Sequence, residues 1–304
     1  MKHALILFFA AVVFNACNKE GNNDNDTAKL GIQFKFDAAQ VRQNNIGLPA
    51  ALPQGNAALT PDFKQMSVHY IELAQGAFTQ LGQGAVVYHA TETSQGGETA
   101  VDFKKAVRSG QDSVFLEINL SDIPPGTYEW VRASVTYQNF DVKFNIRNIP
   151  VVGDLLQQSG RVSSFVGFNT FIESAPLAQG NFPVNTNKKQ GFWIFETQFA
   201  PPYNLYNETH SGQAPVGATT VVNPLFNSSP VPAGSCVVTG KLAQPLVVTG
   251  DETTDRLLTL SFSINQSFEW VDTNGNGQLD IYADGTPAEQ IVDMGLRGLF
   301  PYLD

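Results

Sequence analysis

Oxygen-bearing side chains recur at alternate positions of one segment near the C-terminus, where a glycine stands at the point of sharpest turning. The segment begins at Asp272 and reads DTNGNGQLD, with Gly277 as its sixth residue. Ca²⁺ takes about six to eight oxygen ligands at about 2.3–2.6 Å, and alternate residues of a tightly wound loop can converge on one such ion. We therefore predict a structural Ca²⁺ site whose ligands are Asp272, Asn274, Asn276, Gln278, Asp280 and Asp284.

The spacing of this segment resembles the calcium loop of EF-hand proteins. Position twelve is Ala283 instead of a bidentate glutamate, so the next residue, Asp284, is expected to contribute. Two of the ligands are uncharged asparagines, which predicts a weak affinity of about 10⁻⁴–10⁻³ M. The flanks alternate like strands, so the resemblance is to EF-hand-like loops set into secreted β proteins, and the ion would pin Phe268–Val271 to the segment 291–299. The alternative is a bare hairpin turn, because Asn-Gly pairs favour type I′ turns.

Cys17 is the second residue whose position implies chemistry. Lys2 gives a positive start, and an apolar run follows from Ala4 to Phe14. That pattern is typical of a secretory signal, and a run this short covers only about half of a bilayer core. The residues Phe14-Asn15-Ala16-Cys17 resemble the lipobox of bacterial lipoproteins, which implies a signal peptide over 1–16 and a lipid on Cys17 as the new N-terminus. The alternative is an ordinary signal peptide with a chance cysteine.

The residues after Cys17 indicate where the protein is placed. Residues 18–26 contain no apolar side chain and are rich in Asn and Asp, so 17–28 is predicted to be a flexible tether. This composition resembles the surface-export signal of Bacteroidota lipoproteins. The resemblance implies an outer-membrane lipoprotein exposed at the cell surface, and hence a membrane contact through the lipid anchor.

Composition excludes several classes of protein. Hydrophobic residues make up 42% and charged residues 15% of the chain, which is typical of a globular body with a large core. The net charge of −10 argues against nucleic acid as a partner and against electrostatic docking on anionic lipid. If Cys17 carries lipid, Cys236 has no cysteine to pair with, and we expect it to be a buried thiol.

Apolar and polar residues alternate through most of the chain, as in Leu30, Ile32, Phe34 and Phe36. Period-two runs between Gly, Pro and Asn turns predict an all-β antiparallel sandwich with long loops and little helix, and a partly open barrel is the alternative. The segment Ile123–Arg132, with its Pro-Pro-Gly turn, resembles a strand–turn–strand signature of transthyretin-like β-sandwich modules in Bacteroidota surface lipoproteins. Residues 29–304 are expected to form the β domain, with a possible sub-domain boundary near 145–160.

Two segments are predicted to be irregular. Residues 151–159 are expected to be a short helix or a loop, and residues 201–233 a long polar loop of the kind that is often functional. The aromatic side chains Trp193, Tyr203 and Tyr206 are candidates for stacking on sugars.

The sequence contains no motif of the common hydrolases, nucleotide-binding proteins or metalloproteases, so we do not expect an enzyme. His69 and His89 are expected to be structural and His210 to be solvated. Two triplets, at Thr27 and Ser113, resemble the Bacteroidota O-glycosylation motif.

The first functional hypothesis is therefore a surface-tethered binding or adhesion module for a glycan or protein ligand. The second is a structural or accessory subunit of an envelope or fimbria-like assembly. The third is a glycan-acting hydrolase, because a catalytic pair of carboxylates leaves no local motif.

Overall fold

The computed structural model describes residues 27–44, 47–214 and 236–304. The predicted signal peptide, Cys17 and the tether up to residue 26 lie outside the described residues. The strands are β1 Lys29–Asp37, β2 Asn56–Leu59, β3 Asp62–Ala74, β4 Ala85–His89, β5 Glu92–Thr93, β6 Ala100–Asp102, β7 Ser113–Asn119, β8 Gly126–Ile149, β9 Gly153–Phe165, β10 Thr170–Leu177, β11 Gly180–Lys188, β12 Phe192–Gln198, β13 Thr209–Gln213, β14 Cys236–Val248, β15 Arg256–Ser263, β16 Phe268–Val271, β17 Asp280–Tyr282, β18 Ile291–Met294 and β19 Leu299–Leu303. The helices of the described part are the short 3₁₀ turns η1 Leu120–Asp122 and η2 Tyr203–Tyr206, and neither is long and apolar enough to cross a membrane.

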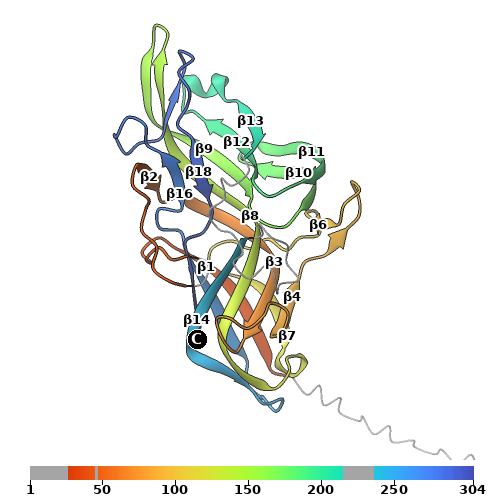
Figure 1. The fold of residues 1–304 in the computed structure, drawn as a ribbon. Helices are drawn as coiled ribbons and strands as arrows, with labels where there is room; N and C mark the ends of the chain where they lie inside the picture. The colour runs from red at the N-terminus through yellow and green to blue at the C-terminus, as the bar shows by residue number, and fades with distance from the viewer. Residues whose placement is uncertain (1–26, 45–46, 215–235) are drawn as a thin grey trace, which may run out of the picture.

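These strands form an all-β sandwich, as the alternation predicts. The largest sheet that the described residues form, called here the main sheet, has eight strands in the order β13-β12-β9-β8-β3-β4, with β14 and β17 also paired to β8. One sheet of the fold curves into a half-barrel. Strand β8 is 24 residues long and runs through both halves of the molecule, pairing with β3 and β14 first and with β9 and β17 later (Figure 1).

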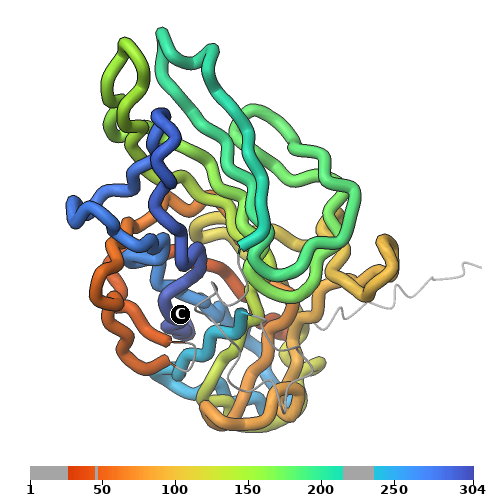
Figure 2. The backbone as a smooth tube through the Cα atoms, turned by 45° about the horizontal axis from the view of Figure 1, so that its top comes forward, coloured from red at the N-terminus to blue at the C-terminus, as the bar shows by residue number. Residues whose placement is uncertain are grey.

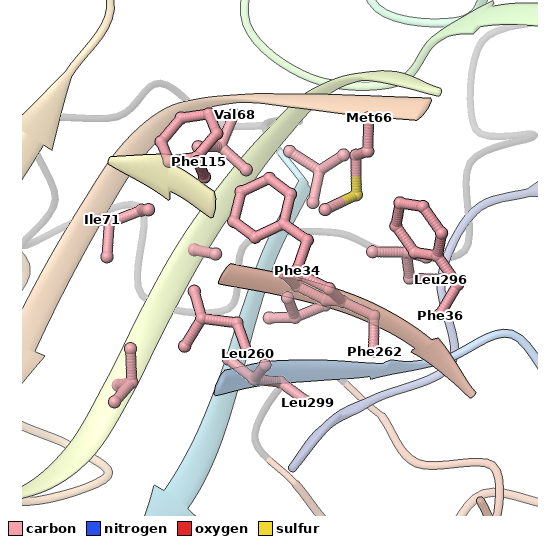
Figure 3. Packing of buried hydrophobic residues seen from close by; sticks show 14 of the residues in the cluster. Phe34, Phe36, Met66, Val68, Ile71, Phe115, Leu260, Phe262, Leu296 and Leu299 are labelled. Carbon is pink, nitrogen blue, oxygen red and sulfur yellow. The ribbon is translucent and has the colours of Figure 1, made fainter. Parts of the chain in front are cut away.

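The main core lies between the first half of the main sheet and the sheet β19-β15-β1-β7. The predicted alternation of β1 is confirmed, because its inward side chains, Leu30, Ile32 and Phe34, are completely buried. The Phe34 ring stacks on Phe115 at 4.4 Å between centroids and meets the edge of Phe262 at 5.4 Å (Figure 3). A second core joins the main sheet to the sheet β11-β10-β6-β5, around Tyr137, Phe165 and Ile172.

Two expectations about irregular segments are wrong in part. Residues 151–159 are neither helix nor loop beyond their first turn, because Val151 and Gly153 adopt positive φ and reverse the chain, and residues from Gly153 onward pair with β8. Within 201–214 the chain forms η2 and β13, and the remainder of the predicted loop, from 215, lies outside the described residues. The boundary proposed near 145–160 falls in the β8–β9 hairpin, and the division into one or two sub-domains stays a prediction.

At the end of the molecule away from β1, the tip of β8–β9, the chain between β17 and β18 and the connection between β12 and β13 all extend in the same direction (Figures 1 and 2). A separate small sheet, β18-β16-β2, lies at the same end. Its central strand carries Glu269, whose buried carboxylate pairs with Arg42 and Arg297. This arrangement sets two sheets against each other, and the main core continues between them through Phe144, Phe268 and Trp270.

Candidate functional site

In the part of the chain that the structure describes, a groove of about 970 Å³ separates the second half of the main sheet from the β16–β18 region. Its volume lies at the upper end of the range of about 300–1,000 Å³ that small-molecule sites occupy. The main sheet contributes one wall, which includes Val142, Phe144, Val162, Trp193 and Phe195. The region of β16 and β18 contributes Phe268, Ile291 and Met294, and the segment that leads into and includes β17 adds Leu279 and Ile281.

Strand periodicity explains why aromatic rings face this groove. Alternate residues of β12 share one face of the sheet, so Trp193, Phe195 and Thr197 line the groove while Ile194 enters the second core. The sequence of β12 is apolar on both faces because each face is covered.

Two glycines on neighbouring strands leave room for the rings of β12. A Cβ atom at Gly160 of β9 would stand 2.2 Å from Cε2 of Phe195, and one at Gly212 of β13 would stand 2.6 Å from Cζ2 of Trp193. Each ring therefore lies over a glycine of the adjacent strand, and any larger residue there would displace it.

The three aromatics proposed from the sequence all border this groove. Trp193 comes from β12, and Tyr203 and Tyr206 come from the 3₁₀ turn η2. Tyr206 is 69% exposed, so its ring is accessible to a ligand. The structure thus brings together side chains that the sequence places in two different segments.

Polar groups of the groove stand mainly near β13 and β18. His210 Nε2 lies 3.1 Å from Oε2 of Glu208, and both residues border the groove beside Gln213. Among the described residues that line the groove there is no Lys or Arg. A ligand with a negative charge would find no Lys or Arg on these walls and would meet Glu208 and Glu289, so the electrostatics disfavour an anion.

The predicted calcium loop, residues 272–280, adjoins the same groove. Oδ1 of Asp272 accepts a hydrogen bond from the backbone N–H of Asn276 at 3.2 Å, and Oδ2 accepts one from Gly277 at 2.9 Å. The side-chain amides of Asn274 and Asn276 each donate to Oδ2 of Asp280 at 2.7 Å. Three of the predicted ligands therefore meet at one carboxylate oxygen, and Asp272 braces the turn that brings them there.

The loop joins two different sheets, which is not the geometry of a two-residue hairpin turn. Strand β16 before it pairs with β2 and β18, whereas β17 after it pairs with β8. Gly275 and Gly277 have φ of 71° and 70°, the left-handed conformation that glycine adopts at no steric cost. Leu279 turns into the core and also lines the groove.

Asp280 is the most strongly held carboxylate of the loop. Its Oδ1 accepts hydrogen bonds from Asn145 Nδ2 at 2.8 Å and from Arg147 Nε at 2.9 Å. Burial alone would raise the pKa of Asp280, but the hydrogen bonds from Asn145, Asn274 and Arg147 lower it below 3.8. The carboxylate is therefore ionised at neutral pH, and a cation would share it with Arg147.

Two other residues differ from expectation. The Asp284 carboxylate accepts from Asn148 Nδ2 at 2.7 Å and from the backbone N–H of Thr286 at 3.0 Å, and it has no contact with the other predicted ligands among the bonds of the described residues. Glu289 reaches the loop instead, where Oε1 accepts from the Thr273 N–H at 3.0 Å and Oε2 from the Asp280 N–H at 2.9 Å. The sequence gives no signal for this role, because Glu289 lies beyond the spacing of the loop.

The donor types are those of a weak calcium site, although Oδ1 of Asn274 and Oδ1 of Asn276 each accept a backbone hydrogen bond in this structure. Asp272 and Asp280 supply two carboxylates, Asn274 and Asn276 supply amide oxygens once their side chains turn, and Gln278 supplies a carbonyl. The Gln278 side chain is engaged elsewhere, because its Oε1 accepts from Asn145 Nδ2 at 2.7 Å. Two charges and a competing arginine are consistent with the low affinity expected from the sequence.

The predicted O-glycosylation sites and the second cysteine differ in exposure. Thr27 and Ser113 are both exposed, and the Ser113 hydroxyl donates to the Gln111 carbonyl at 3.2 Å. Cys236 is buried as predicted, and burial raises the pKa of its thiol, so it is a poor nucleophile. Cys17 lies outside the described residues.

No protein-family model, no curated protein and no solved structure matches this chain. The groove and the oxygen-rich loop beside it are therefore the features from which a function can be inferred.

Proposed function

We propose that the protein is a lipid-anchored binding module of the cell envelope, and that its groove holds an uncharged, apolar ligand. The observation that carries this proposal is the groove itself, about 970 Å³ of space whose lining is mostly aromatic and aliphatic and, among the described residues, includes no Lys or Arg. Burial of apolar surface contributes about 25 cal/mol per Å². Walls of this composition therefore gain most from a ligand with few polar groups.

The test uses N-phenyl-1-naphthylamine, an uncharged apolar fluorophore whose emission rises in an apolar environment. We expect saturable binding by the purified protein. Replacing Tyr206 by Ala should weaken binding about tenfold, which corresponds to about 1.4 kcal/mol. Phe78 is a matched control, because its exposed fraction of 72% is close to the 69% of Tyr206 and it does not line the groove.

Saturable binding that Tyr206→Ala weakens and Phe78→Ala leaves unchanged would support the groove as the site. Absence of saturable binding, or equal binding by both variants and the parent, would reject it. An anionic probe of similar size, such as a fluorescent fatty acid, should bind more weakly than the neutral probe if the charge argument is correct.

A glycan is the second candidate ligand, favoured by the gathering of Trp193, Tyr203 and Tyr206 on one groove. Aromatic rings can stack on the apolar face of a sugar. The opposite wall, however, is built from side chains such as Ile291 and Met294, and each sugar hydroxyl buried there without a partner would cost about 1–3 kcal/mol. A glycan array on which the parent binds and Trp193→Ala does not would make the glycan the preferred ligand.

We also propose a structural role for Ca²⁺ at the loop, held by Asp272, Asn274, Asn276, Asp280 and the carbonyl of Gln278. The ion would supply positive charge between two carboxylates. Because Leu279 and Ile281 line the groove, an ordered loop would keep this wall in place. Calorimetry should give a dissociation constant of about 10⁻⁴–10⁻³ M.

At a Ca²⁺ concentration of 100 times the dissociation constant, binding to the folded state alone should add about 2.7 kcal/mol to the free energy of unfolding. Asp251→Asn is a control outside the loop, because Asp251 is exposed. No heat of Ca²⁺ binding together with no change in melting temperature on chelation would reject the site.

The alternative role is that of a subunit in an envelope assembly. Strand β13 is the terminal strand of the main sheet, and an edge strand can accept a further strand from a partner. Co-purification of a stoichiometric envelope protein that is lost when β13 carries a proline, as in Ser211→Pro, would support this role over that of a ligand-binding module.

A further inference from the structure

His69, His89 and Glu92 come together at the edge of the main sheet that is opposite to β13. His69 lies on β3, and His89 ends β4, where it stands across from Tyr70 in the strand pairing. The Ala90 N–H donates to the His69 carbonyl at 2.8 Å, and the chain then turns so that Glu92, at the start of β5, faces both rings. A nitrogen of each ring and a carboxylate oxygen all lie within 4.8 Å of one another.

The distances between these atoms are close to those in a metal site. Nε2 of His69 is 2.9 Å and Nε2 of His89 is 3.9 Å from Oε1 of Glu92. Ligand atoms at about 2.0–2.2 Å from a tetrahedral Zn²⁺ stand about 3.3–3.6 Å from one another. A small rotation of the exposed His89 and Glu92 side chains would therefore bring the three atoms to ligand distance.

The surroundings orient both imidazoles. Nδ1 of His89 lies 3.0 Å from the Ala90 carbonyl, so it carries the proton and leaves the lone pair on Nε2. Metal-binding histidines commonly have their second nitrogen fixed by such a hydrogen bond. The His69 ring stacks on Phe168 with 4.4 Å between centroids and 5° between planes. Nδ1 of His69 is buried and has no hydrogen-bond partner among the described residues, so this ring is held by the stacking and by the contact of Nε2 with Glu92.

The cluster is open on one side. The side chain of His69 is 4% exposed, whereas those of His89 and Glu92 are 49% and 32% exposed. One ligand is thus fixed in the protein and two face solvent, which leaves space for water at a fourth position. Three protein ligands with an open position are the pattern of exchangeable or catalytic zinc sites, whereas structural sites have four protein ligands.

We propose that His69, His89 and Glu92 bind a divalent transition-metal ion such as Zn²⁺. Two imidazole nitrogens and one carboxylate suit Zn²⁺ and its neighbours in the first transition row, and Ca²⁺ and Mg²⁺ prefer oxygen ligands alone. This site is distinct from the oxygen-rich loop in both its residues and its chemistry. It joins β3, β4 and β5, so the ion would fasten two sheets of the fold to each other.

The experiment is calorimetric titration of the purified protein with Zn²⁺ in the presence of excess Ca²⁺. We expect one Zn²⁺ per chain at this site, with an affinity that His89→Gln and Glu92→Gln each weaken by at least about tenfold. The matched control is His210→Gln, because His210 is also an exposed histidine, 57% for its side chain, with a glutamate 3.1 Å away, and it should bind Zn²⁺ as the parent does. Co²⁺ gives a second readout, because its visible absorption reports nitrogen ligation and low coordination number.

Far-ultraviolet circular dichroism and melting in chelator establish that each variant is folded, and the comparison is made among folded variants. Loss of Zn²⁺ affinity and of the Co²⁺ bands in His89→Gln and Glu92→Gln, with both retained in His210→Gln, would support the site. Absence of stoichiometric Zn²⁺ binding, or equal binding by the parent and these two variants, would overturn it. Displacement of Zn²⁺ by an equal concentration of Ca²⁺ would also overturn the proposal, because Ca²⁺ competes only for a site made of oxygen ligands.

Discussion

Replacing Glu269 by Gln tests how the wall of the groove formed by β16 and β18 is held. Oε2 of Glu269 lies 2.8 Å from Nη2 of Arg42 and 2.8 Å from Nη2 of Arg297, and Oε1 accepts from Asn56 Nδ2. The Glu269 side chain is 1% exposed and the two arginine side chains are 7% and 8% exposed. The neighbouring Phe268 lines the groove, so this ion cluster lies directly behind that wall.

The expected loss of stability follows from the burial of these charges. Removing one partner of a buried ion pair costs about 3–5 kcal/mol, because the other charge is left without compensation. Asp293 still pairs with Arg297 in the variant, which places the expected loss near the lower end, at about 3 kcal/mol. For a chain of this size that corresponds to a fall in melting temperature of about 6–12 °C.

The effect should also depend on pH in a defined direction. Burial alone would raise the pKa of Glu269, but the hydrogen bonds from Asn56 and Arg42 and the charge of Arg297 lower it below 4.5. A carboxyl group whose pKa is lower in the folded state adds stability above its unfolded pKa, and this stability is lost as the pH falls through the folded pKa. The difference between parent and Glu269→Gln should therefore be full at pH 7 and shrink as the pH falls below 4.5.

The assay is urea unfolding followed by tryptophan fluorescence, with Glu117→Gln as the matched control. Glu117 is 60% exposed and stands 3.9 Å from Lys29, so its replacement should cost less than about 1 kcal/mol. A loss below about 1 kcal/mol in Glu269→Gln, or a difference that grows as the pH falls, would refute the view that the buried cluster holds this wall.

Four further predictions concern the groove, the loop, the anchor and the surface. In Gly212→Ala the new Cβ would stand 2.6 Å from Trp193, so the ring must move into the groove, and we expect about 1–3 kcal/mol lower stability and weaker probe binding by fluorescence titration. Asp272→Asn removes a charge and should weaken Ca²⁺ binding about tenfold by calorimetry, and an unchanged affinity would exclude Asp272 as a ligand. Cys17→Ser should abolish metabolic labelling with a fatty acid and release the protein from the membrane fraction, and equal labelling of variant and parent would refute the anchor. Ser113→Ala should lower the intact mass of the protein from its native host by one glycan if Ser113 is modified, and a parent mass without any glycan increment would dismiss the modification.

Much of the fold could be predicted from the sequence because its strands are locally encoded. The alternation around Phe34 specifies both the strand and the buried face, and burial then follows from the sheet that covers it. The spacing from Asp272 to Asp280 likewise specifies a tight loop with converging side chains. For the strand and for the loop alike, the residues that specify the local conformation lie within a single short segment.

The parts that the sequence does not predict depend on contacts between distant segments. Residues from Gly153 onward form a strand because β8 pairs with them, which no local pattern indicates. Glu289 closes the loop only because the chain returns past β17. His69 and His89 appear unrelated in the sequence, and the β3–β4 pairing is what sets their rings side by side with 4.7 Å between centroids.

The length of β8 determines how far the groove stands from the start of the folded body. The Leu120 N–H donates to the Ala28 carbonyl at 2.8 Å, so the chain enters the body close to where β8 begins at Gly126. The groove begins at Val142, up to about 50 Å farther along an extended strand. The groove and the point where the chain enters the folded body therefore lie toward opposite ends of β8. If Cys17 carries the lipid, the body itself is the spacer between the attachment point and the ligand site, and shortening β8 would bring the two closer together.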